Sequence, residues 1–104
     1  MQEHTKIYLK GCGYTDTCFV SSEISNQRAV DTHHIISRGR GGDNRLENLM
    51  ALTREEHLTF GDKNQYMVFL LNIHRAFLKN RGVKFNNDWF EDKIKHYNTT
   101  HLFI

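Results

Sequence analysis

The sequence VDTHHIISRGRGGDNRLENLMALTREEH, residues 30–57, contains two adjacent histidines, a loop rich in glycine and arginine, an asparagine and a third histidine. β-branched residues around the paired histidines predict a strand over residues 29–36. The polar segment 37–45 predicts a loop. Residues 48–52 predict a second short strand, antiparallel to the first if the loop turns straight back.

The segment after the second strand carries a clear helix start. Thr53 and Glu56 match a capping box, in which the threonine hydroxyl accepts from the glutamate N–H and the carboxylate reaches back. This predicts a helix with His57 in its first turn and an end near Gly61. The predicted order is therefore strand, loop, strand and helix, with the paired histidines on the first strand.

The sequence on either side of this stretch predicts an irregular or extended N-terminal segment and two C-terminal helices. Residues 1–28 read as irregular or extended because Gly11 and Gly13 interrupt short apolar pieces. A long helix is expected between Asp62, as N-cap, and Gly82, as stop signal. Residues 88–97 predict a shorter last helix. Two apolar stripes of the long helix and three residues of the last predict the core: Tyr66, Leu70, Ile73, Phe77; Met67, Leu71, His74, Leu78; Trp89, Phe90 and Ile94.

Composition places the chain among single-domain globular proteins. It has 104 residues, 38% of them hydrophobic and 25% charged, with a net charge of only +2. No apolar run reaches membrane-spanning length and no hydrophobic signal segment opens the chain, so we expect a cytoplasmic protein without a membrane partner. Cys12 and Cys18 lack a second pair, which predicts free thiols.

The order of histidines and asparagine in this stretch resembles that of the HNH nucleases, whose ββα-metal finger is shared with colicin nuclease domains. The segments AVDTHHI, RGRGGDNRLENLMAL and EEHLTFGDK look especially like the small stand-alone HNH proteins of phages and bacteria. The resemblance spans roughly residues 22–66. It implies an α+β fold in one domain, with an N-terminal segment 1–28, a finger of two short antiparallel strands and a helix over residues 29–61, and a helical part 62–104.

The resemblance also implies a divalent-metal-dependent endonuclease that hydrolyses DNA phosphodiester bonds. His34 would be the general base, since a neutral imidazole accepts protons near pH 7. His33 and His57 would bind one Mg²⁺, Mn²⁺, Ni²⁺ or Zn²⁺ ion, and Asn48 would brace the loop. Asp62 is a weaker candidate for a further ligand, because an N-cap role also explains it.

Other charged residues of the stretch have supporting roles in this interpretation. Asp31, two residues before His33, is expected to orient an imidazole or to be a plain surface carboxylate. Phosphate contacts are assigned to the four arginines around the histidines, Arg38, Arg40, Arg45 and Arg54. Adjacent side chains of a strand face opposite ways, so His33 and His34 reach one phosphate only if the strand ends or twists there.

The chain departs from many HNH proteins in one respect. Those relatives bind a structural zinc ion through two C-x-x-C pairs, whose places here are Ser22 with Ser25 and Thr53 with Glu56. None of the four is a thiolate, so we expect no structural zinc.

Two alternatives stay open at this stage. The finger could be a catalytically inactive module that binds nucleic acid or a protein, or a zinc-stabilised interaction domain, which the lack of thiolate pairs disfavours. We expect DNA as partner, with RNA as an alternative, and either a monomer or a homodimer.

Overall fold

The computed structural model describes residues 2–15, 20–29 and 31–102, the last four of these by their backbone alone. In this part of the chain the elements are, in order, the helix α1 (Glu3–Cys12), the strand β1 (Asp31–His34), the 3₁₀ turns η1 (Arg38–Arg40) and η2 (Leu46–Asn48), the strand β2 (Leu49–Leu52) and the helices α2 (Arg54–Phe60), α3 (Asn64–Asn80) and α4 (Asn87–Leu102). The predicted α+β class and the strand–loop–strand–helix order are confirmed.

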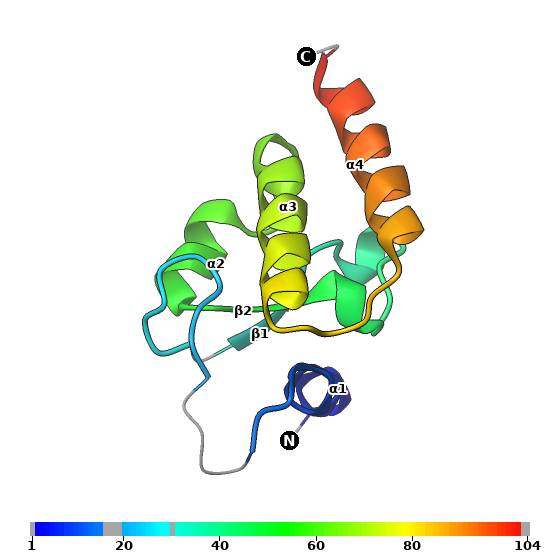
Figure 1. Ribbon diagram of the computed structural model, residues 1–104. Helices are drawn as coiled ribbons and strands as arrows, with labels where there is room; N and C mark the ends of the chain where they lie inside the picture. Colours follow the sequence, from blue (N-terminus) through cyan, green and yellow to red (C-terminus); the bar gives the residue numbers. More distant parts are fainter. Residues whose placement is uncertain (1, 16–19, 30, 103–104) are drawn as a thin grey trace.

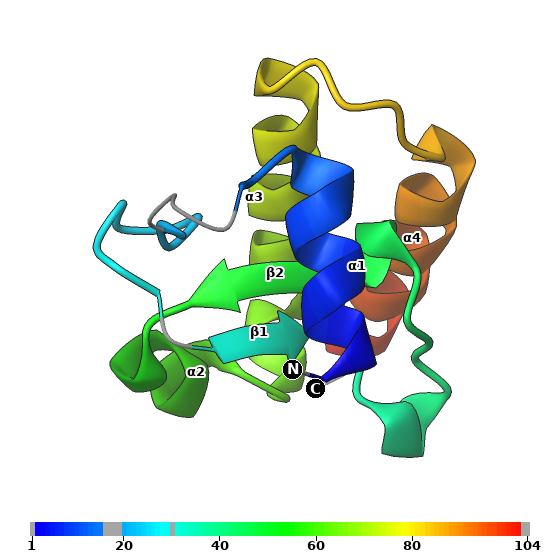
Figure 2. The same ribbon diagram turned by 90° about the horizontal axis from the view of Figure 1, so that it is seen from below.

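The two strands form a small antiparallel sheet at the centre of the molecule. His33 pairs with Met50 and His34 with Leu49, and β1 ends at His34. Helix α1 lies on one side of the sheet, whereas α2 and α3 lie on the other, and α4 stands beside α3 (Figures 1 and 2). Residues on successive positions of β1 are therefore directed at different helices.

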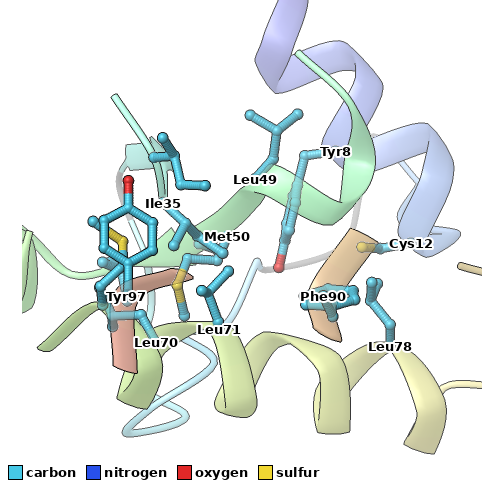
Figure 3. Close-up of a cluster of buried hydrophobic side chains, with 14 residues drawn as sticks. Tyr8, Cys12, Ile35, Leu49, Met50, Leu70, Leu71, Leu78, Phe90 and Tyr97 are labelled. Carbon is cyan, nitrogen blue, oxygen red and sulfur yellow. The ribbon is translucent and has the colours of Figure 1, made fainter. Parts of the chain in front are cut away.

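The core fills the space between the sheet and α3. All residues of β2 are buried, and they meet an apolar face of α3 that includes Leu70, Leu71 and Leu78 (Figure 3). Tyr8 of α1 and Phe90 of α4 complete this cluster, and both are fully buried. Of the two predicted stripes of α3, the one with His74 is buried together with Leu70.

The prediction of an extended N-terminal segment over residues 1–28 is wrong for its first part, because Glu3–Cys12 is helical. The helix buries only Tyr8 and Cys12, one turn apart, so its amphipathic pattern is short. Gly11 lies inside the helix, where α1 packs closely on Leu46. Tertiary contact with the sheet and η2 thus overrides a glycine that is locally unfavourable in a helix.

Two predicted helix starts need correction, whereas the third is confirmed. Thr53 and Glu56 form both hydrogen bonds of a capping box, and α2 ends before Gly61. Asp62 does not cap α3: its φ is 55°, in the left-handed region, and Lys63 is the N-cap. Helix α4 begins at Asn87 rather than Asp88, since the Asn86 side chain accepts from Trp89 N.

Within the described residues, no helix combines the length and the apolar character that a membrane crossing requires.

Candidate active site

The hairpin and α2 bring His33 and His57 together. His33 follows Asp31 by two positions on β1 and is 6% exposed, whereas His57 lies in α2 with a side chain that is 43% exposed. Their ring centroids are 4.2 Å apart, with the planes tilted by 55°. Two imidazoles that are 24 residues apart in the sequence thus meet at one point, one buried and one open to solvent.

The buried imidazole has an unused nitrogen. Among the described residues, the Nε2 atom of His33 is buried without a hydrogen-bond partner. Burial, with the neighbouring His57 and His34, lowers the pKa of His33 to about 4, although Asp62 and Asp31 oppose the shift. His33 is therefore neutral at pH 7, and a buried neutral nitrogen without a partner is the state in which an imidazole binds a metal.

Two carboxylates lie near the histidine pair without completing a cluster. Asp31 Oδ2 is 3.9 Å from His57 Nδ1, beyond hydrogen-bonding distance. Asp62, the weaker ligand candidate, forms an ion pair of 3.2 Å with Arg40. In the part of the chain that the structure describes, no three His, Cys, Asp or Glu side chains are grouped to hold a metal ion. A metal here would thus have two protein ligands, His33 and His57, and open positions for water and substrate oxygens.

Gly61 closes the space beside this pair. A Cβ atom at Gly61 would lie 2.7 Å from His57 Cδ2, 3.1 Å from His33 Cε1 and 2.5 Å from the His57 carbonyl oxygen. Its φ of −67° is ordinary, so it is the close approach and not the backbone conformation that requires glycine. The loop after α2 therefore packs directly on the two imidazoles.

Asn48 joins the two ends of the loop through the hydrogen bonds of its side chain. Its Oδ1 accepts from Ile36 N at 2.8 Å, and its Nδ2 donates to the carbonyl oxygens of Ile36 at 3.0 Å and Asp43 at 2.9 Å. Asn48 is fully buried, and a Cβ at Gly42 would lie 2.9 Å from its Nδ2 and 1.7 Å from Ile36 O. Glycine at position 42 thus lets the loop close around the amide.

His34 contacts Asn44 of the loop and His4 of α1. Its Nε2 lies 2.8 Å from Asn44 Oδ1, and its ring centroid is 4.6 Å from that of His4. The strand ends at His34, as the sequence interpretation requires, but the two adjacent histidines still lie in different surroundings. They are close enough that His34 contributes to the low pKa of His33.

The four predicted phosphate-binding arginines are exposed, and each has an acidic or amide neighbour. Arg38 donates to Asn44, and Arg40 pairs with Asp62 and donates to Asn64. Arg45 pairs with Asp43 and lies over the Trp89 ring, 5.4 Å from its centroid. Arg54 is 74% exposed and only 3.9 Å from Asp31 at its nearest approach. Of the three arginines that have an acidic neighbour, Arg54 is held most loosely by it.

Ser22, Ser25, Thr53 and Glu56, the four positions that the resemblance matches to zinc-binding cysteines, are linked to one another by hydrogen bonds. Ser22 donates to Glu56 Oε1 at 2.5 Å, and its own Oγ accepts from the backbone of Ile24 and Ser25. Thr53 and Glu56 are joined by the capping box. Although burial raises the pKa of Glu56, hydrogen bonds from Ser22, Ser25 and Thr53 outweigh it and keep that pKa below its ordinary value. Hydrogen bonds therefore join the loop to α2 at this point.

The two cysteines lie elsewhere. Cys12 is a buried free thiol of α1, and burial, with Glu23, raises its pKa to about 12. Cys18 lies outside the described residues.

Sequence reasoning missed two neighbours of His34 and one buried network. His4 comes from a helix that was not predicted, and Asn44 is an ordinary loop residue by its local pattern. His74, expected to be packed or partly exposed, is fully buried between Glu23, at 2.8 Å from its Nδ1, and the carbonyl of Leu46, at 2.8 Å from its Nε2. Each contact joins residues from distant parts of the sequence, which no local spacing reveals.

Comparison of the chain with protein-family models found no match. The same search among curated proteins and among solved structures found none either.

Proposed function

We propose that this chain is a divalent-metal-dependent endonuclease of the HNH type, acting on DNA phosphodiester bonds. The observation that carries the proposal is the His33–His57 pair, in which a buried Nε2 lacks a partner beside a solvent-open imidazole. A buried histidine with a purely structural role is expected to have its ring nitrogens hydrogen-bonded, as both ring nitrogens of His74 are.

The residues around the pair fit a divalent ion. His33 and His57 would hold it, and the ion would supply charge stabilisation to the phosphoryl oxygens. Asp31 and Asp62 add negative charge nearby, which favours a cation at this point.

His34 would accept the proton of the attacking water. The water oxygen then forms a bond to phosphorus as the bond from phosphorus to the 3′ oxygen breaks, and the leaving oxygen takes a proton from solvent. Asn48 keeps the loop after His34 in place, and the exposed Arg54 offers a guanidinium to a neighbouring phosphate.

One observation favours the second candidate, an inactive finger that binds nucleic acid. His33 packs on His57 of α2 and His34 on His4 of α1, two helices on opposite sides of the sheet, and the described residues offer no group of three metal ligands. A binding module would need neither His34 nor a metal for its affinity.

Incubation with supercoiled plasmid separates the two. The protein is expected to nick the plasmid with Mg²⁺, Mn²⁺ or Ni²⁺ and to stop when a chelator is added. His34→Ala should reduce the rate by at least about 100-fold, whereas His96→Ala, at an exposed position of α4, should leave it unchanged. Binding of the plasmid without cutting in any metal would instead support the inactive module, and a labelled RNA tested in parallel reports the nucleic-acid preference.

A further inference from the structure

Asn44 and Arg38 together fix which nitrogen of His34 carries a proton. Arg38 Nη2 donates to Asn44 Oδ1 at 3.1 Å, and His34 Nε2 lies 2.8 Å from the same oxygen. A guanidinium can only donate, so the amide atom facing Arg38 must be the oxygen. Since that oxygen can only accept, His34 Nε2 must be the donor in its contact with Asn44.

This hydrogen bond leaves the other ring nitrogen of His34 free to act. A neutral imidazole has one protonated nitrogen and one lone pair, so a proton on Nε2 places the lone pair on Nδ1. A base needs a lone pair at the nitrogen that meets its proton. The side chain of Asn44 therefore settles both the orientation and the tautomer of the His34 ring.

His4 supports the same ring from α1. Its imidazole forms a hydrogen bond with the backbone of Thr32 and lies 4.6 Å, centroid to centroid, from that of His34. Burial, and then His34 itself, lower the pKa of His4, although the hydrogen bond to the Thr32 backbone opposes this shift. Thus α1, which lies outside the ββα part of the fold, packs on the ring assigned as base.

We propose that Asn44 is a positioning residue that holds His34 in its Nε2-protonated tautomer, with His4 as a packing support for the same ring. This inference deepens the proposed function and rests on it for the catalytic role of His34. The tautomer itself is a property of the free protein, so it is measured without substrate or metal.

The test is ¹⁵N NMR of the His34 imidazole at mildly alkaline pH, compared between the wild type and variants of Asn44. Wild type should show a protonated Nε2, with a hydrogen slow to exchange with water, and an unprotonated Nδ1. Asn44→Leu, which removes the acceptor at similar volume, should lose the slow exchange of that hydrogen. Asn44→Asp, which keeps an acceptor oxygen, should retain it. A proton on Nδ1 in the wild type would overturn the inference outright.

Cleavage kinetics test the link to catalysis. Asn44→Leu should lower kcat about 10–100-fold with KM little changed, as expected for a residue that orients a functional imidazole. Asn44→Asp should recover most of kcat, and circular dichroism of each variant controls for folding. Wild-type kcat in a folded Asn44→Leu variant would refute the positioning role. If the wild type cuts no substrate, the proposed function and with it the catalytic role of Asn44 fail, while the tautomer still decides whether Asn44 fixes the ring.

Discussion

Replacement of Asn48 by alanine is expected to destabilise the protein severely without any metal or nucleic acid present. The amide makes three hydrogen bonds, to Ile36 N, Ile36 O and Asp43 O. The side chain is fully buried, so water cannot take its place without a change in structure. Each backbone group left without a partner costs about 1–2 kcal/mol, which gives about 3–6 kcal/mol for the three.

This loss is a large part of the roughly 5–15 kcal/mol by which a domain of this size is stable. Urea unfolding followed by circular dichroism measures the loss in free energy of unfolding directly. In thermal unfolding, Tm should fall by at least about 12 °C, at about 4 °C or more per kcal/mol. Asn48→Asp tests the direction of the hydrogen bonds, because it changes only the amide nitrogen to an oxygen. It keeps the acceptor for Ile36 N but turns a carboxylate oxygen toward two carbonyl oxygens, so at neutral pH it should be no more stable than Asn48→Ala.

Asn80→Ala, at an exposed position near the end of α3, provides the control and should change stability by no more than about 0.5 kcal/mol. A loss of less than about 1 kcal/mol in Asn48→Ala would contradict this role of Asn48, since the loop would then close without the amide.

Three further predictions concern other parts of the molecule. Gly61→Ala should cost about 1–3 kcal/mol in urea unfolding, because the added Cβ meets the His57 carbonyl at 2.5 Å; wild-type stability would contradict the packing. Glu56→Ala should lose about 1–3 kcal/mol at neutral pH, and the gap to wild type should close as pH falls below the ordinary value of 4.5 and through the lowered pKa of Glu56; a pH-independent gap would show that the carboxylate is not responsible. Cys12 should resist thiol reagents at about pH 8 while the protein is folded, because burial keeps it protonated. Since its pKa rises from 9.0 to about 12 on folding, its contribution to stability should be lost as pH rises through that interval, and Cys12→Ala should flatten that decline.

The sequence predicts those features that depend on neighbouring residues. The Thr53–Glu56 capping box is a local motif, and the structure contains both of its hydrogen bonds. The antiparallel strands on either side of the polar loop bring His33 into contact with His57 of α2. The role of Asn48 as a brace for the loop is implied by the resemblance and not by local spacing, because two of its three hydrogen bonds reach Ile36, twelve positions away.

Features that depend on tertiary packing escaped sequence reasoning. Helix α1 buries just Tyr8 and Cys12, and its internal Gly11 argues locally against a helix. Aspartate is a residue type that favours the N-cap position, but the tight turn between α2 and α3 holds the backbone of Asp62 in the left-handed conformation. The contact of His4 with His34 joins residues 30 positions apart, so it becomes visible only once α1 is placed on the sheet.

The buried network of His74 shows the same limit. Its Nδ1 meets the Glu23 carboxylate, which also accepts from the Tyr8 hydroxyl at 2.7 Å. These residues come from α3, from the segment before β1 and from α1. Periodicity places His74 on the inner face of α3 but does not identify the partners that make its burial tolerable.

We propose that the His33–His57 pair is a metal site, and calorimetric titration of the metal-free protein with Mn²⁺ or Ni²⁺ is the test of this claim. The wild type should bind one equivalent, His33→Ala and His57→Ala should each weaken binding by at least about tenfold, and His96→Ala should bind as the wild type does. Equal affinity in the wild type and His33→Ala, or no binding in the wild type, would contradict the claim.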